Sequence, residues 1–98
     1  MLIKIHKSYR NVVAICDYEL IDKKFEEGER QLDLTGDFFK GEKKNREEIK
    51  EIIRKEQLED SCFFIVGEKS VEVSKEVGLI SEEGIKKIQN IPVALALL

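Results

Sequence analysis

Two side chains of types that can take part in catalysis, Cys16 and Asp17, are adjacent in the sequence. The chain's only histidine, His6, precedes them. A catalytic cysteine must ionise to the thiolate, which needs a nearby imidazole, cation or helix N-terminus. His6 is therefore the only imidazole that could serve Cys16 as a base, with Asp17 as a third partner. The competing interpretation makes Cys16 a small buried apolar residue beside a surface histidine. We favour this second interpretation, because free cysteines are among the most buried residues.

Whether Cys16 and His6 can meet depends on the pairing of two expected strands, residues 2–7 and 12–18. If the connecting loop is residues 9–11, Lys4 lies opposite Cys16 and His6 lies diagonally on the same face. If the loop is residues 8–11, Ile3 lies opposite Cys16 and His6 points to the other face. A shift of one residue reverses the face, so the sequence leaves both alternatives open.

Metal binding receives little support from the spacing of possible ligands. Cys16, Cys62 and His6 lack the close pairs of a zinc site, and a structural site needs four ligands. The acidic residues between positions 17 and 27 are typical of solvated surface in so charged a chain. We therefore expect no metal and no cofactor.

A loop at residues 36–44 (GDFFKGEKK) combines adjacent aromatic residues with lysines. Such a loop can stack a nucleic-acid base and hold a phosphate. The residues that would make this contact are Phe39, Lys40, Lys43, Lys44 and Arg46. The alternative, which we favour, is that a phenylalanine anchors the loop to the core while the lysines stay solvated. Asp37 and Glu42 offset much of the local positive charge.

Hydropathy patterns indicate the elements that must position these residues. Apolar runs or alternation predict strands at 2–7, 12–18, about 30–35, 61–66 and 93–98. Helical periodicity predicts helices at 45–57 and 68–77, with a third, short helix capped by Ser81. These elements predict an α+β fold: a two-layer mixed sheet with helices on one face, in the order β-β-β-α-β-α-α-β. We expect one domain over residues 1–98.

Three local features sharpen this fold prediction. Asn45 is a good N-cap, and Glu48 three residues later completes a capping-box pattern. The C-terminal IPVALALL carries no charge, so we expect an interior strand there, with burial in a homodimer as the alternative. We expect these side chains in the core: Ile5, Ile15, Leu32, Ile49, Ile52, Phe63, Ile65 and Val77.

Composition limits the classes of function. The 98 residues are 42% hydrophobic and 38% charged, with a formal net charge of −3. The negative charge disfavours a general nucleic-acid binder. No segment has the roughly 18 apolar residues that cross a membrane. Both cysteines lie in apolar runs, which predicts a reduced, cytoplasmic protein. The abundance of Glu and Lys is typical of thermophiles.

Several blocks of the chain carry a resemblance to a known family. They are AICDYELIDKKFEEGERQLDL, DFFKGE, IVGEKSVEVSKEVGLI and IQNIPVA, in that order. The most characteristic parts are Cys16-Asp17 with Leu20, Phe39 to Glu42, and Val66 to Glu68. Together they resemble the archaeal domain-of-unknown-function 424 family. The resemblance implies a small archaeal cytosolic α+β protein without an established activity, in a setting near translation genes.

These observations favour a non-enzymatic module that binds a protein or ribonucleoprotein, in a translation-associated setting. The alternative is a small enzyme that uses Cys16 and Asp17 in a pocket beside the hairpin. The residue patterns lean against an enzyme, because no familiar catalytic motif is present. We expect a monomer or a homodimer without membrane contact, and RNA is a partner that the net charge disfavours.

Overall fold

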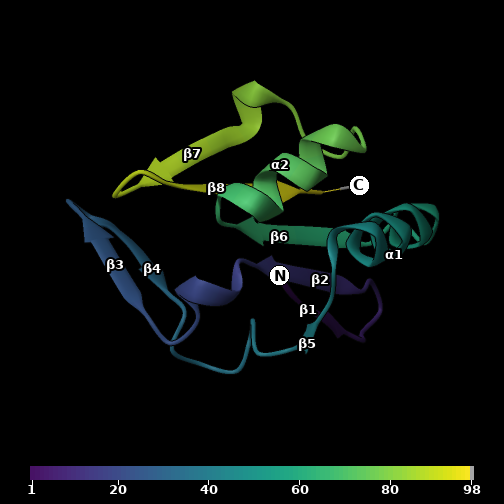
Figure 1. The fold of residues 1–98 in the computed structure, drawn as a ribbon, viewed down its shortest axis with the longest axis horizontal. Coiled ribbons are helices and arrows are strands. Elements are labelled where there is room, and N and C mark those ends of the chain that lie inside the picture. The colour runs from purple at the N-terminus through teal and green to yellow at the C-terminus, as the bar shows by residue number, and fades with distance from the viewer. Residues whose placement is uncertain (98) are drawn as a thin grey trace.

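A six-stranded mixed sheet organises the molecule (Figure 1). The computed structural model describes residues 1–97, and its strand order is β5-β1-β2-β6-β8-β7. The bounds are β1 (Leu2–His6), β2 (Val12–Cys16), β5 (Glu42–Lys43), β6 (Cys62–Val66), β7 (Ile85–Ile88) and β8 (Ile91–Ala96). β2 and β6 run parallel, and the other neighbours are antiparallel. The predicted α+β class with a mixed sheet is confirmed.

Two helices, α1 (Arg46–Leu58) and α2 (Glu68–Glu76), cover one face of this sheet. The predicted capping box starts α1: Asn45 Oδ1 accepts from Glu48 N at 2.9 Å, and Glu48 Oε1 accepts from Asn45 N at 3.1 Å. The main core lies between helices and sheet and is formed by Ile3, Val13, Ile15, Ile49, Ile53, Phe63, Ile65, Val71, Val73 and Ala96. Within residues 1–97, no helix is long and apolar enough to cross a membrane.

A two-stranded hairpin covers part of the opposite face of the sheet. Its strands are β3 (Lys24–Glu27) and β4 (Arg30–Asp33), and the 3-10 turn η1 (Tyr18–Leu20) leads into it. The smaller core beneath the hairpin consists of Ala14, Cys16, Leu32, Leu34, Phe39 and Val66. A strand near residues 30–35 was predicted, whereas its separate pairing with β3 was not.

Most of the predicted core positions are buried. Ile15, Leu32, Ile49, Phe63 and Ile65 are buried as expected. The other three predicted residues, Ile5, Ile52 and Val77, are partly buried and pack against the main core. The predicted layer of helices on the sheet is therefore correct.

The prediction of a third helix after Ser81 is wrong. Residues 82–84 form only a 3-10 turn, η2 (Glu82–Gly84), and β7 follows it. Gln89 and Asn90 both have positive φ, 50° and 66°, and make a two-residue turn that places Ile88 opposite Ile91. Two successive residues with positive φ are the geometry of a type I′ hairpin. Pairing with β8 therefore overrides the cap at Ser81 and the helix-like charge order of residues 82–87.

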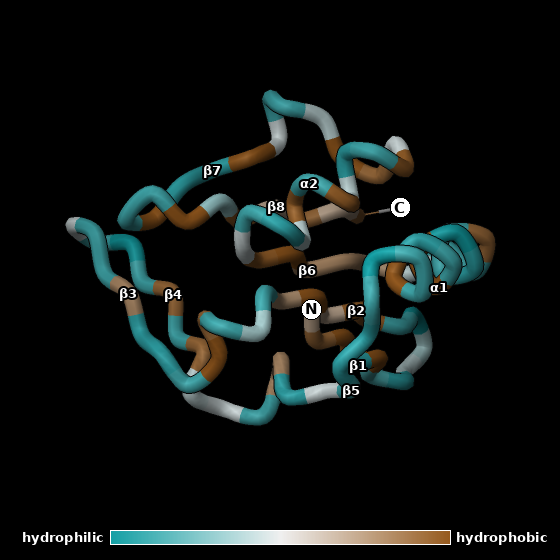
Figure 2. The backbone as a smooth tube through the Cα atoms, viewed as in Figure 1, coloured by the Kyte–Doolittle hydropathy of each residue, from teal (hydrophilic) through white to brown (hydrophobic). Residues whose placement is uncertain are grey.

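The C-terminal strand β8 is interior, as predicted, because it lies between β6 and β7. Its apolar character is visible in Figure 2, where the central strands are largely brown. The pairing with β7 stops at Ala94, so Leu95 and Ala96 pair with β6 alone. The predicted strand included Leu98, which lies outside the described residues.

Candidate functional site

Cys16 ends β2, one of the two parallel central strands. It pairs with Val66, the last residue of β6, so the carboxyl ends of both strands lie side by side. The Cys16 side chain is fully buried, and its Sγ lies 3.3 Å from the Asp17 carbonyl oxygen. Burial, together with the nearby negative charge of Asp17, raises the pKa of the thiol from 9.0 to about 12. Cys16 is therefore a neutral thiol near neutral pH and a poor nucleophile.

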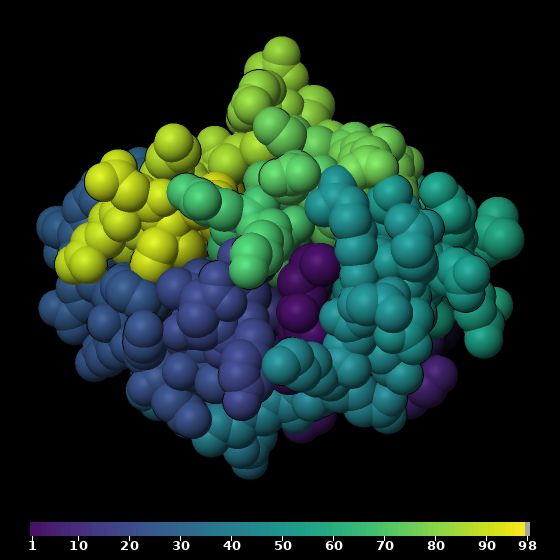
Figure 3. All heavy atoms as spheres, viewed as in Figure 1, coloured from purple at the N-terminus to yellow at the C-terminus, as the bar shows by residue number. Residues whose placement is uncertain are grey.

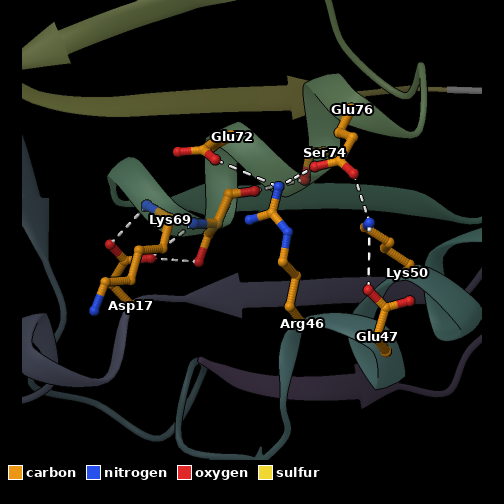
Figure 4. A network of polar contacts seen from close by, with 9 residues as sticks. Asp17, Arg46, Glu47, Lys50, Lys69, Glu72, Ser74 and Glu76 are labelled. Carbon is orange, nitrogen blue, oxygen red and sulfur yellow. Dashed lines mark hydrogen bonds and ion pairs between the residues drawn. The ribbon is translucent and has the colours of Figure 1, made fainter.

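The Asp17 carboxylate caps helix α2. It accepts hydrogen bonds from Lys69 N at 3.0 Å, Ser70 N at 2.8 Å and Ser70 Oγ at 2.7 Å (Figure 4). Glycine is required at position 67, because its φ is 109° and a Cβ there would lie only 2.3 Å from Asp17 Cγ. A helix N-terminus has unpaired N–H groups that attract an anion. Here the protein's own carboxylate occupies that position.

A cavity of about 220 Å³ lies beside this cap. Three segments meet around it: the turn after β2, the start of α2, and the turn before β8, which are blue, green and yellow in Figure 3. The lining residues are Asp17, Glu19, Leu20, Glu68, Lys69, Asn90, Ile91 and Pro92. Carboxylates outnumber the one ammonium group, and Lys69 Nζ already lies 3.9 Å from Glu19. Phosphate and other anions are therefore disfavoured in this cavity.

His6 and Cys16 are not brought together. The hairpin pairs Leu2 with Cys16 and His6 with Val12, so neither of the two predicted registers is correct. The connecting loop spans residues 7–11 and is longer than either alternative assumed. His6 shares a face with Cys16 but lies four residues further along the strand pair, roughly 13 Å at 3.3 Å per residue. His6 Nε2 instead lies 2.9 Å from the Phe38 carbonyl oxygen.

The aromatic loop is anchored on the same sheet face. Phe39 is buried, while Phe38 is 39% exposed and stacks on His6 with ring centroids 4.5 Å apart. Both phenylalanines also contact Phe64 edge to face, at 5.9 Å for Phe38 and 5.3 Å for Phe39. Phe39 therefore serves as a core anchor, and Phe38 presents the exposed aromatic edge.

The basic residues of the loop have partners of their own. Lys40 lies 2.8 Å from Asp22, and Lys44 lies 3.1 Å from Glu42. Lys43 Nζ sits 4.3 Å from the centre of the Tyr18 ring. These partners lie on several different segments, so the structure does not gather the three ammonium groups around Phe38.

Arg46, the last predicted contact, belongs to an ion network between α1 and α2 (Figure 4). It contacts Glu72 at 3.3 Å and also Glu76, while Lys50 lies 2.5 Å from Glu76. The hydrogen bonds from Lys50 and Arg46 lower the pKa of the Glu76 carboxyl group. This network fastens the two helices together on the outer surface.

One surface escaped the sequence reasoning: the part of the sheet that the hairpin leaves uncovered. A row of half-buried side chains crosses β1, β2 and β6 at His6, Val12 and Cys62. In the next row, Phe64 is half-buried and its partner Leu95 is 58% exposed. We call this surface, with Leu97 just beyond β8, the open sheet face: His6, Val12, Phe38, Cys62, Phe64, Leu95 and Leu97.

The sequence did contain a signal for this surface. β6 and β8 are apolar at every position, a pattern that is typical of strands buried on both faces of a sheet. The hairpin is too small to cover both ends of the sheet, so Leu95 and Leu97, at 58% and 74% exposure, remain in contact with solvent. Within residues 1–97, no three His, Cys, Asp or Glu side chains are grouped as metal ligands.

Comparison with known proteins agrees with this architecture. The fold is a small α+β protein with a mixed sheet, one helical layer and a partly open second face. The model of the family described as "Protein of unknown function (DUF424)" matches residues 6–97, so the chain belongs to that family.

A solved structure has the same fold. It is the crystal structure of an uncharacterized conserved protein from Methanopyrus kandleri, with 23% sequence identity and a TM-score of 0.85. The match covers 96% of this chain and 87% of the other. At this identity the likeness shows the fold alone. No curated protein matches the chain.

Proposed function

We propose that this protein is a non-enzymatic binding module that docks on a protein, alone or within a ribonucleoprotein, through the open sheet face. The exposure of Leu95 and Leu97 beside Phe38 and Phe64 carries the proposal. Contiguous apolar surface with aromatic side chains is typical of protein interfaces. A translation-associated setting is part of the proposal and rests on the family resemblance, while the two free cysteines support a reducing, cytoplasmic compartment.

The geometry speaks against the alternative of a small cysteine enzyme. Cys16 is buried and its pKa is raised, His6 lies too far along the strand to act as its base, and Asp17 is engaged at the start of α2. For a ribonucleoprotein partner, we keep the aromatic loop as the proposed RNA contact. Its support is the exposed edge of Phe38 together with the exposed Lys40 and Lys43, which an RNA phosphate would have to draw from their contacts with Asp22 and Tyr18.

A paired capture experiment tests the docking surface. Tagged chain is used to capture partners from a lysate of the native organism, and Leu95→Asp is compared with Leu58→Asp. Leu58 is 88% exposed at the far end of α1 and serves as the matched control. We expect a specific captured protein that Leu95→Asp loses and Leu58→Asp retains. Equal capture by both variants, or the absence of any specific partner, would contradict the proposal.

A further inference from the structure

A groove opens beside Leu95, at the edge of the open sheet face. It has a volume of about 240 Å³ and lies along the paired strands β7 and β8, reaching past the end of their pairing to Gly84 and Leu95. The residues that line it are Arg30, Gly84, Lys86, Ile88, Val93, Ala94 and Leu95. Its floor is therefore aliphatic, and its only charged groups are two cations from different elements, β4 and β7.

The two cations of the groove lie outside the ion pairs of the described surface; Glu27, the cross-strand neighbour of Arg30, accepts a hydrogen bond from Gln89 N instead. Lys40, Lys50 and Lys75 each contact a carboxylate elsewhere on the surface. By contrast, Arg30 and Lys86 are exposed and form no ion pair within the described residues, 1–97. The lining of the groove is therefore basic and apolar, although the chain has a net charge of −3.

We propose that the groove binds an acidic segment of a partner protein. A leucine-sized aliphatic side chain packs against Ile88, Val93 and Leu95, and carboxylates of the segment meet Arg30 and Lys86. This rests on the proposed function, because the groove shares Leu95 with the open sheet face. The charge complementarity specifies the partner's chemistry, since unpaired cations at an interface rim favour acidic partners and penalise basic ones.

Two other occupants fit the groove less well. A second copy with its own groove facing this one would bring Arg30 and Lys86 against identical cations, and like charges at an interface are unfavourable. An RNA strand would find the phosphate partners but no aromatic lining on which to stack its bases. The aliphatic floor at Ile88 and Val93 instead matches an aliphatic side chain.

Amide chemical shifts of the ¹⁵N-labelled protein test this proposal with defined probes. The probes are the capped peptides EELLEE, EESSEE and KKLLKK and a uridine oligonucleotide. We expect EELLEE to shift the amides of Ile88 and of residues 93–97 and to bind more weakly when salt rises from about 50 to about 300 mM. EESSEE and KKLLKK should bind at least about ten-fold more weakly, because each lacks one of the two matched features.

Charge-reversed variants distinguish binding to the cations of the groove from attraction by the overall charge of the protein. Arg30→Glu with Lys86→Glu should weaken EELLEE binding about ten-fold, because it replaces two attractive charge contacts at the groove with repulsive ones. The matched control is Arg54→Glu with Lys55→Glu, which reverses one arginine and one lysine on the exposed side of α1 and should leave binding unchanged.

Four results would overturn the proposal. Two concern the peptide: EELLEE changes no amide chemical shift, or both double variants weaken its binding equally. The other two are that the oligonucleotide binds at the groove in preference to EELLEE, or that amide shifts of groove residues change when the protein concentration alone is raised. The partner capture described above separates failure of the acidic-segment proposal from failure of the proposed docking surface. If Leu95→Asp abolishes capture but Arg30→Glu with Lys86→Glu does not, the docking surface stands and the acidic partner is wrong. If Leu95→Asp has no effect, the proposed function itself fails.

Discussion

The Asp17 end of the sheet and the open sheet face differ in how they use their residues. At the first, a carboxylate, a serine and two backbone N–H groups satisfy one another inside the fold. At the second, Phe38, Leu95 and Leu97 expose apolar surface that the fold leaves unpaired. The residue types associated with chemistry therefore serve structure here, whereas residue types associated with a core remain available to a partner.

The parallel pairing of β2 with β6 causes this difference. It brings Asp17 to the start of α2, where the helix dipole and the free N–H groups stabilise a negative charge. At the opposite ends of the same strands, Val12 and Cys62 lie beyond the reach of the β3–β4 hairpin. One end of the parallel pair is thus closed by polar contacts, and the other end is open and apolar.

Truncation of Phe63 should give the largest loss of stability and provides the buried reference against which exposed positions are compared. Phe63→Ala should lower the free energy of unfolding by about 4 kcal/mol, because it leaves a cavity in the main core. Urea denaturation monitored by circular dichroism measures this loss. A loss under about 1 kcal/mol would show that the helices do not pack on this face of the sheet.

Removal of the Asp17 carboxylate should come next. Asp17→Ala should cost about 3 kcal/mol, because it leaves the N–H groups of Lys69 and Ser70 without their buried partner. Glu19→Ala is the matched control: it removes a neighbouring but exposed carboxylate and should change little. Equal stability of the two variants in urea would mean that Asp17 is free for another role.

Alkaline pH should destabilise the protein through Cys16. The pKa of its thiol is about 12 in the folded state, against an ordinary value of 9.0. Between these values the thiol ionises in the unfolded chain but not in the folded protein, so the free energy of unfolding is unaffected below pH 9 and falls as pH rises towards 12. At pH about 10.5 the loss should be about 2 kcal/mol. It should be absent in Cys16→Ala and retained in Cys62→Ala. A loss of equal size in both variants would rule out Cys16 as its cause.

The open sheet face should give the smallest effect on stability. Leu95→Ser should change the free energy of unfolding by less than about 0.5 kcal/mol, because the side chain is mostly exposed already. The same urea titration provides the measurement, with Phe63→Ala as the buried reference. A loss comparable to that of Phe63→Ala would show that Leu95 is a core residue in solution and not a surface anchor.

Local signals predicted the elements better than their partners. The capping box at Asn45 and the uncharged β8 identified α1 and the interior strand, because both patterns depend on neighbouring residues. The predicted β1–β2 register was wrong because no residue of the five-residue loop at 7–11 determines a particular turn length. Residues 85–88 were assigned to a helix because a capping serine and two glutamates precede two lysines, a charge order that suits a helix dipole. The same lysines fit the exposed positions of a short strand equally well.

The candidate site was harder to predict than the fold. The sequence could identify Cys16 and Asp17 as chemically capable, but the burial of Cys16 and the capping by Asp17 depend on the pairing of β2 with β6, whose paired residues lie 50 positions apart in the chain. The exposure of Leu95 depends on the short reach of β7 and of the hairpin. Such long-range coverage cannot be deduced from the local hydropathy of β8.

Site-specific photo-cross-linking tests the central claim most directly. A photoreactive phenylalanine analogue at position 97, beside Leu95, is compared with the same analogue at position 58 in chain expressed in the native organism. We predict a discrete adduct with one protein from position 97 and none from position 58. No adduct from position 97, or the same adducts from both positions, would contradict the assignment of the open sheet face as the docking surface.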